Sequence, residues 1–125
     1  MIRGVGTDIV AVARMTDMHA RFGARLARRV LSAGEWDEYA AVQHKDRFLA
    51  RRFAAKEALA KALGTGLRAP VTLSNIGIGH DALGRPEYLP AHELGAWLAE
   101  RGIVRLHLSI SDEHHYAVAF AIAES

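Results

Sequence analysis

The chain has 125 residues, a length typical of one domain, and we expect residues 1–125 to fold as a single unit. Half of the residues are hydrophobic and 24% are charged, which excludes an intrinsically disordered chain. No apolar run reaches the ~18 residues that a transmembrane helix needs, and the N-terminus lacks the pattern of a secretory signal. The absence of cysteine excludes disulfides and thiolate chemistry. We therefore expect a cytoplasmic protein.

Positive charge is concentrated in the first half of the chain. Residues 1–68 contain 13 Lys and Arg against 7 Asp and Glu, whereas residues 69–125 contain 3 against 7. Thirteen of the 16 basic residues are arginine, which pairs bidentately with carboxylates and phosphates. The first half is therefore expected to meet an anionic partner. Charge alone leaves nucleic acid, an acidic protein and a phosphorylated small molecule open.

A strand and a helix are predicted at the start of the chain. Side chains alternate between two faces over residues 2–10, which predicts a strand. Helical spacing predicts a helix over residues 12–26. One stripe of this helix carries Arg14, Met18, Arg21 and Arg25, with Phe22 beside it.

Two further helices are predicted in the first half. Ser32 and Glu35 have the spacing of a capping box, which opens a short helix through Tyr39. The longest helix is predicted over residues 46–63, because this segment is rich in helix-forming residues and contains neither glycine nor proline. Gly64 is placed to end it.

The second half is predicted to contain four strands and one helix. The strands are expected at 72–79, 86–89, 105–111 and 116–123, and the helix at 92–101. The last two strands are close enough in sequence to form an antiparallel hairpin. These elements predict an α+β fold with a mainly antiparallel sheet and one long helix.

Asp8 is the first candidate functional residue. A carboxylate within an otherwise apolar strand is costly unless it is paired or binds a cation. Gly4 and Gly6 share its face, and their missing side chains leave room for a ligand or for another backbone. An ion pair with one of the many arginines explains Asp8 equally well at this point.

Glu57 and Lys61 lie four residues apart on the long predicted helix and project from one face. They fit an ordinary surface ion pair. They also fit a site in which Glu57 shares a divalent cation with Asp8 while Lys61 reaches a phosphate. Magnesium commonly uses one or two carboxylates and takes its other ligands from substrate phosphates and water.

The loop after this helix is the next candidate. Gly64, Thr65 and Gly66 do not form a P-loop, because the loop follows its helix instead of preceding it. A helix C-cap explains Gly64, and the backbone amides of the loop could still contact a phosphate or a base.

The histidines give weaker signals. His107, His114 and His115 fall near the last hairpin, but their spacing matches no standard zinc pattern and no cysteine accompanies them.

Three segments together resemble one enzyme family. GTDIVAVAR at 6–14 and RRFAAKEALAKALGTG at 51–66 are similar to the two signature motifs of the 4'-phosphopantetheinyl transferases, in particular their small bacterial type. LSISDEHHYAVAFAIAE at 108–124 resembles the family's final hairpin, so the similarity covers nearly the whole chain. One position departs from the pattern: many members have histidine where this chain has Asp112.

The resemblance implies an activity. A family member transfers the 4'-phosphopantetheine arm of coenzyme A to a serine of an apo-acyl carrier protein and releases adenosine 3',5'-bisphosphate, in support of fatty acid biosynthesis. Asp8 and Glu57 match the family's magnesium ligands and Lys61 matches a lysine that contacts the coenzyme A phosphates, which makes all three catalytic candidates. Matches to positions near the nucleotide of coenzyme A are Arg52, Gly64, Thr65, Gly66 and Pro86.

The resemblance also implies two protein partners. Arg14 and the helix after it match the surface on which the acidic carrier protein docks. On that surface Arg14, Arg21 and Arg25 would pair with carboxylates. Met18 and Phe22 would supply an apolar anchor between them. Larger relatives resemble two such units in tandem with the site between them, so this chain is expected to form a homotrimer with sites between subunits.

Two other classes of protein remain possible from the residues. A small nucleic-acid-binding module would use the basic residues of the first half, although no nucleic-acid fold signature is present. A noncatalytic adaptor for acidic proteins would leave Asp8, Glu57 and Lys61 without a purpose.

Overall fold

A computed structural model describes all 125 residues and confirms the α+β fold. In chain order the elements are β1 (Ile2–Ala11), α1 (Val12–Phe22), α2 (Ala24–Val30), the 3-10 helix η1 (Ala33–Glu35), α3 (Trp36–Ala41), α4 (Lys45–Leu63), β2 (Ile76–His80), β3 (Pro86–Pro90), α5 (His92–Glu100), β4 (Arg105–Asp112) and β5 (Tyr116–Glu124). None of the helices is both long and apolar enough to cross a bilayer.

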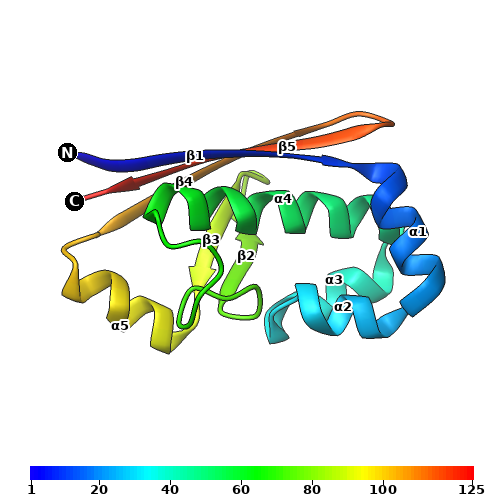
Figure 1. The fold of residues 1–125 in the computed structure, drawn as a ribbon, viewed down its shortest axis with the longest axis horizontal. Coiled ribbons are helices and arrows are strands. Elements are labelled where there is room, and N and C mark those ends of the chain that lie inside the picture. The colour runs from blue at the N-terminus through cyan, green and yellow to red at the C-terminus, as the bar shows by residue number, and fades with distance from the viewer.

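The molecule is arranged in layers around α4. Strands β1, β5 and β4 form an antiparallel three-stranded sheet in the order β1-β5-β4, and α4 runs beneath it (Figure 1). The two-stranded hairpin β2–β3 and the shorter helices lie on the other side of α4 (Figure 1). The termini meet at one end, where the Ser125 amide donates to the Met1 carbonyl at 2.9 Å. This arrangement leaves α4 covered on most of its circumference.

Small residues allow α4 to approach the sheet closely. A Cβ atom on Gly4 or Gly6 would collide with the α4 backbone at Ala62 or Ala58. The face of β5 that packs against α4 consists of buried alanines, at positions Ala117, Ala119, Ala121 and Ala123. Of the two explanations offered for the glycines of β1, the structure therefore supports the approach of another backbone.

The outer face of the same sheet carries larger side chains. Val5, Ile9, Val118 and Phe120 all point away from α4, and between 36% and 63% of each side chain is exposed. This pattern is the reverse of a sheet with one solvated face, in which the large apolar residues point inward and polar residues point outward. An exposed apolar surface of this kind marks an interaction site.

The structure confirms several of the predicted boundaries of helices and strands. Ser32 and Glu35 form the capping box, and η1 leads directly into α3. The long helix starts at Lys45 and ends at Gly64, which adopts the left-handed conformation with a φ of 73°. The four strands and the helix of the second half are all present within a few residues of expectation.

Two predicted elements differ from the structure. The helix predicted over 12–26 is two helices, because Gly23 has φ 54° and ψ −131° and interrupts the helical hydrogen bonds between α1 and α2. The strand predicted over 72–79 begins only at Ile76, since Thr72 to Asn75 form a turn closed by hydrogen bonds from Asn75 and Ile76 to Thr72.

Candidate active site

Asp8 and Lys61 meet where β1 crosses the last turns of α4. The Lys61 Nζ atom lies 2.9 Å from Asp8 Oδ1 and donates to the Thr7 carbonyl at 3.0 Å. The Asp8 side chain is 16% exposed and that of Lys61 is 53% exposed. Asp8 reaches this position because the glycines that precede it let β1 lie directly on the helix. The ion pair is therefore open to solvent on the lysine side.

Glu57 completes a group of three charges. It lies one helical turn before Lys61 on α4, is partly buried and makes no hydrogen bond or ion pair with the protein. Burial raises the pKa of Glu57 above its usual value, the negative charge of Asp8 raises it further, and Lys61 lowers it. A bound cation would favour the ionised form of this unpaired carboxylate and so oppose the effects of burial and of Asp8 on its pKa.

The donor set of this site fits a magnesium ion. No group of three or more His, Asp or Glu side chains is placed to hold a metal anywhere in the chain. Asp8 and Glu57 are close enough for the charge of one to affect the other, and a pair of carboxylates leaves other coordination positions for substrate oxygens and water. The site also lies near the C-terminal end of α4, where the helix dipole favours positive charge.

The loop after α4 borders a basic cavity. Gly64 and Thr65 line a cavity of about 400 Å³. The remaining side chains around it include Arg68, Trp97 and Arg101, with the Arg101 guanidinium stacked 3.8 Å from the centre of the Trp97 ring. Gly66 has a φ of 63°, and this positive φ lets the chain turn back toward Arg68, whose amide donates to the Gly66 carbonyl. The cavity has the charge and the aromatic surface to receive a phosphorylated aromatic ligand.

Arg52 and Pro86 are not part of this cluster within one chain. The Arg52 side chain is only 2% exposed, and its guanidinium lies 3.1 Å from Glu35 Oε1 and 2.7 Å from Glu38 Oε1. Its partners are therefore the carboxylates of a buried residue, Glu35, and of an exposed one, Glu38. Pro86 starts β3 opposite His80 and lines neither of the cavities that include Thr65.

A second basic surface lies on α1 and α2. We define the basic groove as the cavity of about 570 Å³ lined by Met18, Phe22, Arg25, Leu26, Arg28, Arg29, Val30, Phe53 and Leu73. Two residues of the predicted stripe, Met18 and Arg25, reach it from α1 and α2, together with Phe22 beside the stripe. The Arg21 and Arg25 guanidinium groups lie 5.3 and 5.9 Å from the centre of the Phe22 ring. Arg14 lines a smaller adjoining cavity together with Met18.

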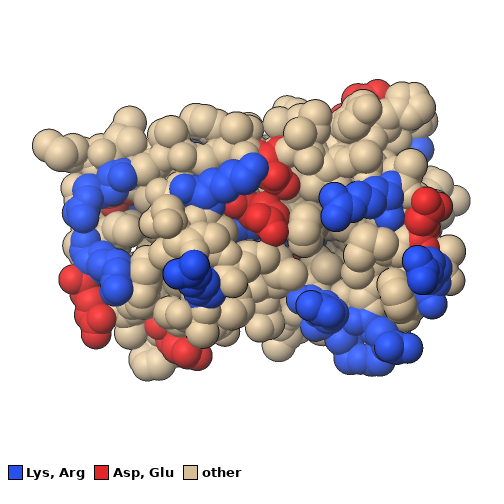
Figure 2. Space-filling view, in the orientation of Figure 1, with Lys and Arg blue, Asp and Glu red and all other residues tan.

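The space-filling view places these features on one face. Acidic side chains gather near the centre, beside a basic side chain, where β1 passes over α4 (Figure 2). Basic side chains cover α1 and α2 at one end of the molecule and the region around α5 at the other (Figure 2). The acidic site is therefore flanked by two basic regions.

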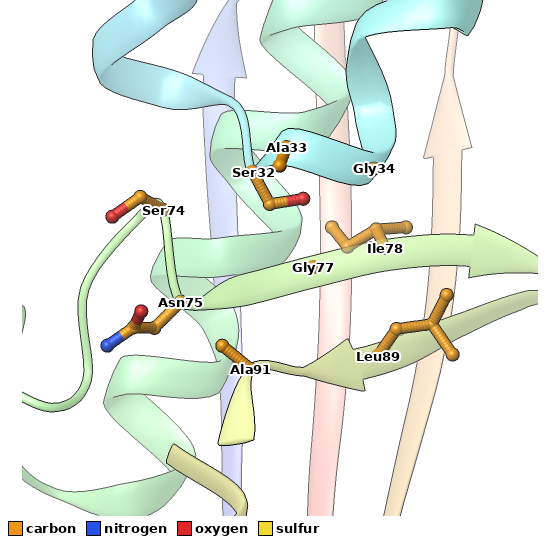
Figure 3. Close-up of a pocket in the computed structure, with 9 residues that line it drawn as sticks. All are labelled: Ser32, Ala33, Gly34, Ser74, Asn75, Gly77, Ile78, Leu89 and Ala91. Atoms are coloured by element: carbon orange, nitrogen blue, oxygen red, sulfur yellow. The ribbon is translucent and has the colours of Figure 1, made fainter. Parts of the chain in front are cut away.

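A buried charge cluster was not anticipated from the sequence. Lys56 is fully buried, and its Nζ atom donates to Glu35 Oε2 at 2.7 Å. The signal that could have indicated it is the spacing of Arg52 and Lys56, four residues apart on the same face of α4 and both opposite Glu35. A smaller cavity lies beside this cluster and is lined by residues of η1 and of the β2–β3 hairpin (Figure 3).

Comparisons with known proteins identify the family of the chain. Residues 4–121 match the family model of the 4'-phosphopantetheinyl transferase superfamily. The holo-[acyl-carrier-protein] synthase of Nitrosospira multiformis is 53% identical over 124 residues, with 99% of each chain covered. The crystal structure of the Neisseria meningitidis holo-[acyl-carrier-protein] synthase is 49% identical, with a TM-score of 0.97 and full coverage of both chains. The Bacillus anthracis synthase, solved in complex with CoA (3',5'-ADP), is 33% identical with a TM-score of 0.83 and covers 100% of this chain and 98% of its own. The chain therefore belongs to the 4'-phosphopantetheinyl transferase superfamily.

Proposed function

We propose that this protein is a holo-[acyl-carrier-protein] synthase, which transfers 4'-phosphopantetheine from coenzyme A to a serine of an apo-acyl carrier protein. The observation that carries the proposal is the meeting of Asp8, Glu57 and Lys61, from β1 and α4, in a solvent-accessible group between two basic regions. Full-length relatives with this activity support it. The reaction belongs to fatty acid biosynthesis, and we place it in the cytoplasm.

The chemistry requires control of negative charge. The serine oxygen forms a bond to the β-phosphorus of coenzyme A, the bond from that phosphorus to the bridging oxygen breaks, and the serine proton is released. Adenosine 3',5'-bisphosphate leaves with the bridging oxygen. A magnesium ion held by Asp8 and Glu57 supplies charge neutralisation of the diphosphate when bound. Lys61 supplies a fixed ammonium beside the same phosphates, held in place by Asp8 and the Thr7 carbonyl.

The nucleotide end of coenzyme A fits the basic cavity after α4. Gly64 and Thr65 lie one helical turn beyond Lys61, so a ligand whose phosphates contact Lys61 can continue into that cavity. Arg68 and Arg101 offer positive charge there, and Trp97 offers an aromatic surface. Gly66 shapes the turn that places Arg68 at the cavity.

Transfer is distinguished from hydrolysis by its stoichiometry. We expect one adenosine 3',5'-bisphosphate to form for each carrier protein consumed, and none to form when the carrier is omitted. Chromatography of the nucleotide products measures this ratio. Release of bisphosphate without carrier protein would contradict the proposal.

The basic groove suits an acidic carrier protein. Arg25, together with Arg21 on its rim, can pair with carboxylates, and Phe22 and Met18 give an apolar anchor between them. Arg14 lines the smaller cavity that shares Met18 with the groove, and from there it can contact the same partner.

Kinetics with Arg14→Ala test this docking surface. We expect KM for the carrier protein to rise about tenfold, the loss of roughly 1.4 kcal/mol of binding, with KM for coenzyme A unchanged. Added salt should weaken carrier binding more than coenzyme A binding, because the groove contacts are exposed charges. Arg105→Ala, an exposed arginine outside the groove, is the matched control. An increase in KM for coenzyme A alone would remove Arg14 from this role.

A homotrimer with sites between subunits also follows from the proposal. The outer face of the β1-β5-β4 sheet exposes large apolar side chains, which a neighbouring copy would cover. Within one chain Pro86 lines neither cavity that includes Thr65, and a site shared between subunits would account for its match to a position near coenzyme A.

A further inference from the structure

Lys56 is a fully buried ammonium with a complete set of partners. Its Nζ atom donates to the Val30 carbonyl at 2.6 Å, to Glu35 Oε2 at 2.7 Å and to the Leu73 carbonyl at 2.9 Å. An ammonium has three donors, so none remains free. These three bonds join α4 to the end of α2, to η1 and to the turn before β2.

Burial of this charge is costly, which makes its placement informative. Burial lowers the pKa of Lys56 and Glu35 opposes that shift. Glu35 is itself buried and is held by the backbone amide and the hydroxyl of Ser32, each at 2.7 Å. An apolar side chain in this position would often stabilise a fold as well as an ion pair does. The bonds to two carbonyl groups also fix Lys56 to two segments outside the ion pair.

Those two carbonyl groups belong to two different segments that line the basic groove. Val30, from α2, and Leu73, from the turn before β2, both line it. Both bond to the same nitrogen atom, so Lys56 fixes the separation of these two walls. Ser32, two residues after Val30, and Ser74, directly after Leu73, line the neighbouring cavity in Figure 3. Lys56 thus ties the two segments together between the two cavities.

We propose that Lys56 is a positioning residue for carrier-protein recognition, which holds the α2 wall and the Leu73 wall of the basic groove at the separation that the docked partner requires. The inference rests on the proposed function, because it assigns the groove to the carrier protein. Lys56 is adjacent in sequence to Glu57, yet it points away from the Asp8 cluster, into the Glu35 pair. Its removal should therefore affect carrier binding and leave the chemical step intact.

Two variants test the inference. Lys56→Met removes the ammonium, and the double variant Lys56→Met with Glu35→Gln removes both charges, so that no buried carboxylate is left without its lysine. The matched control is Tyr88→Phe, which deletes another buried hydrogen bond to α4, from the Tyr88 hydroxyl to the Ala55 carbonyl at 2.6 Å, on the hairpin side of the helix. Circular dichroism and Tm establish that each variant folds.

Steady-state kinetics give the readout. We expect KM for apo-acyl carrier protein to rise at least tenfold in both Lys56 variants, with kcat and KM for coenzyme A within twofold of the parent protein. Tyr88→Phe should lower Tm without changing KM for the carrier. Binding of a carrier protein whose acceptor serine is replaced by alanine, measured by calorimetry, should weaken by the same factor.

Three outcomes would overturn the inference. Unchanged KM for the carrier in a folded Lys56 variant would show that the groove does not depend on this residue. An equal rise in Tyr88→Phe would show that lost stability alone is responsible. A fall in kcat at constant KM would assign Lys56 to the catalytic site through Glu57. If the parent protein left the carrier unmodified, the proposed function itself would fail, which is distinguishable from all three.

Discussion

Glu57 and Lys61, one helical turn apart on α4, stand in different relations to Asp8. Lys61 forms an ion pair with Asp8, whereas Glu57 lies near the same carboxylate without a partner of its own. Ionised Glu57 is therefore disfavoured in the folded protein without metal, and its pKa is raised. Glu57, a candidate metal ligand, thus also lowers the stability of the metal-free folded protein when it is ionised.

The raised pKa of Glu57 predicts that its ionisation destabilises the metal-free protein. A carboxyl group with a folded pKa above its unfolded value binds more protons when folded, so its ionisation lowers stability as the pH rises. We expect Glu57→Gln to raise Tm of the metal-free protein at pH 7, and the gain to shrink as the pH falls toward the ordinary value of 4.5. Thermal unfolding in chelator across this pH range is the measurement. A gain that is equal at pH 7 and pH 4 would show that the shift has another cause.

The three charges of this site could be predicted from the sequence because residue type and spacing carry the information. Asp8 is unusual within its strand, and Glu57 and Lys61 are one turn apart. The place of Arg52 could not be predicted in the same way. Whether an arginine on a helix is exposed or buried depends on what packs against it, here Glu35 and Glu38 from a preceding segment.

At the scale of elements, the contact between β1 and α4 brings the site together. Asp8 comes from the strand and its two partners come from the helix, so their separation depends on how closely the two backbones pack. The glycines of β1 and the alanines of α4 set that distance.

Gly6→Ala tests this dependence. The added methyl group would meet the Ala58 carbonyl and would lie 2.6 Å from the Ala62 amide nitrogen, so the strand must move away from the helix. We expect a loss of about 3 kcal/mol of unfolding free energy, because backbone atoms yield less than side chains. Transfer activity should fall by more than tenfold. Gly34→Ala is the control, since a Cβ there meets nothing within 4 Å. Normal activity in Gly6→Ala would show that close packing is not needed.

The break between α1 and α2 shows where pattern reading fails at this scale. The stripe from Arg14 to Arg25 continues with helical spacing across Gly23, so periodicity alone predicts one helix. Gly23 instead adopts a positive φ, and α2 packs its Leu26, Ala27 and Val30 into the core. Burial of this second apolar face decides the path of the chain, and only tertiary structure reveals it.

For the whole molecule, the main feature is the division of side-chain size across the three-stranded sheet. Alanine and glycine face α4, and valine, isoleucine and phenylalanine face outward. The alternation of side chains between the two faces of each strand could be predicted from the sequence. Which face packs against α4 could not be predicted, since both faces are apolar. The outward face is the surface on which the proposed trimer depends.

Phe120→Asp tests that assembly. Phe120 lies on the central strand of the sheet and is 43% exposed in the single chain. A carboxylate there would be buried without a partner in an assembled trimer, so we expect monomers in sedimentation velocity and a loss of transfer activity. Val104→Asp, which replaces an exposed valine in the segment before β4, should leave assembly unchanged. A fully active monomer of the parent protein would contradict the proposed assembly.

The central claim is that Asp8 and Glu57 support magnesium-dependent transfer of phosphopantetheine. Intact mass spectrometry of an apo-acyl carrier protein, incubated with this protein and coenzyme A, tests it most directly. We predict a mass gain of one phosphopantetheine that requires magnesium and is lost in folded Asp8→Ala and Glu57→Ala variants. A gain that persists without magnesium or in both variants would contradict the assigned site, and no gain with several carrier proteins would contradict the proposed function.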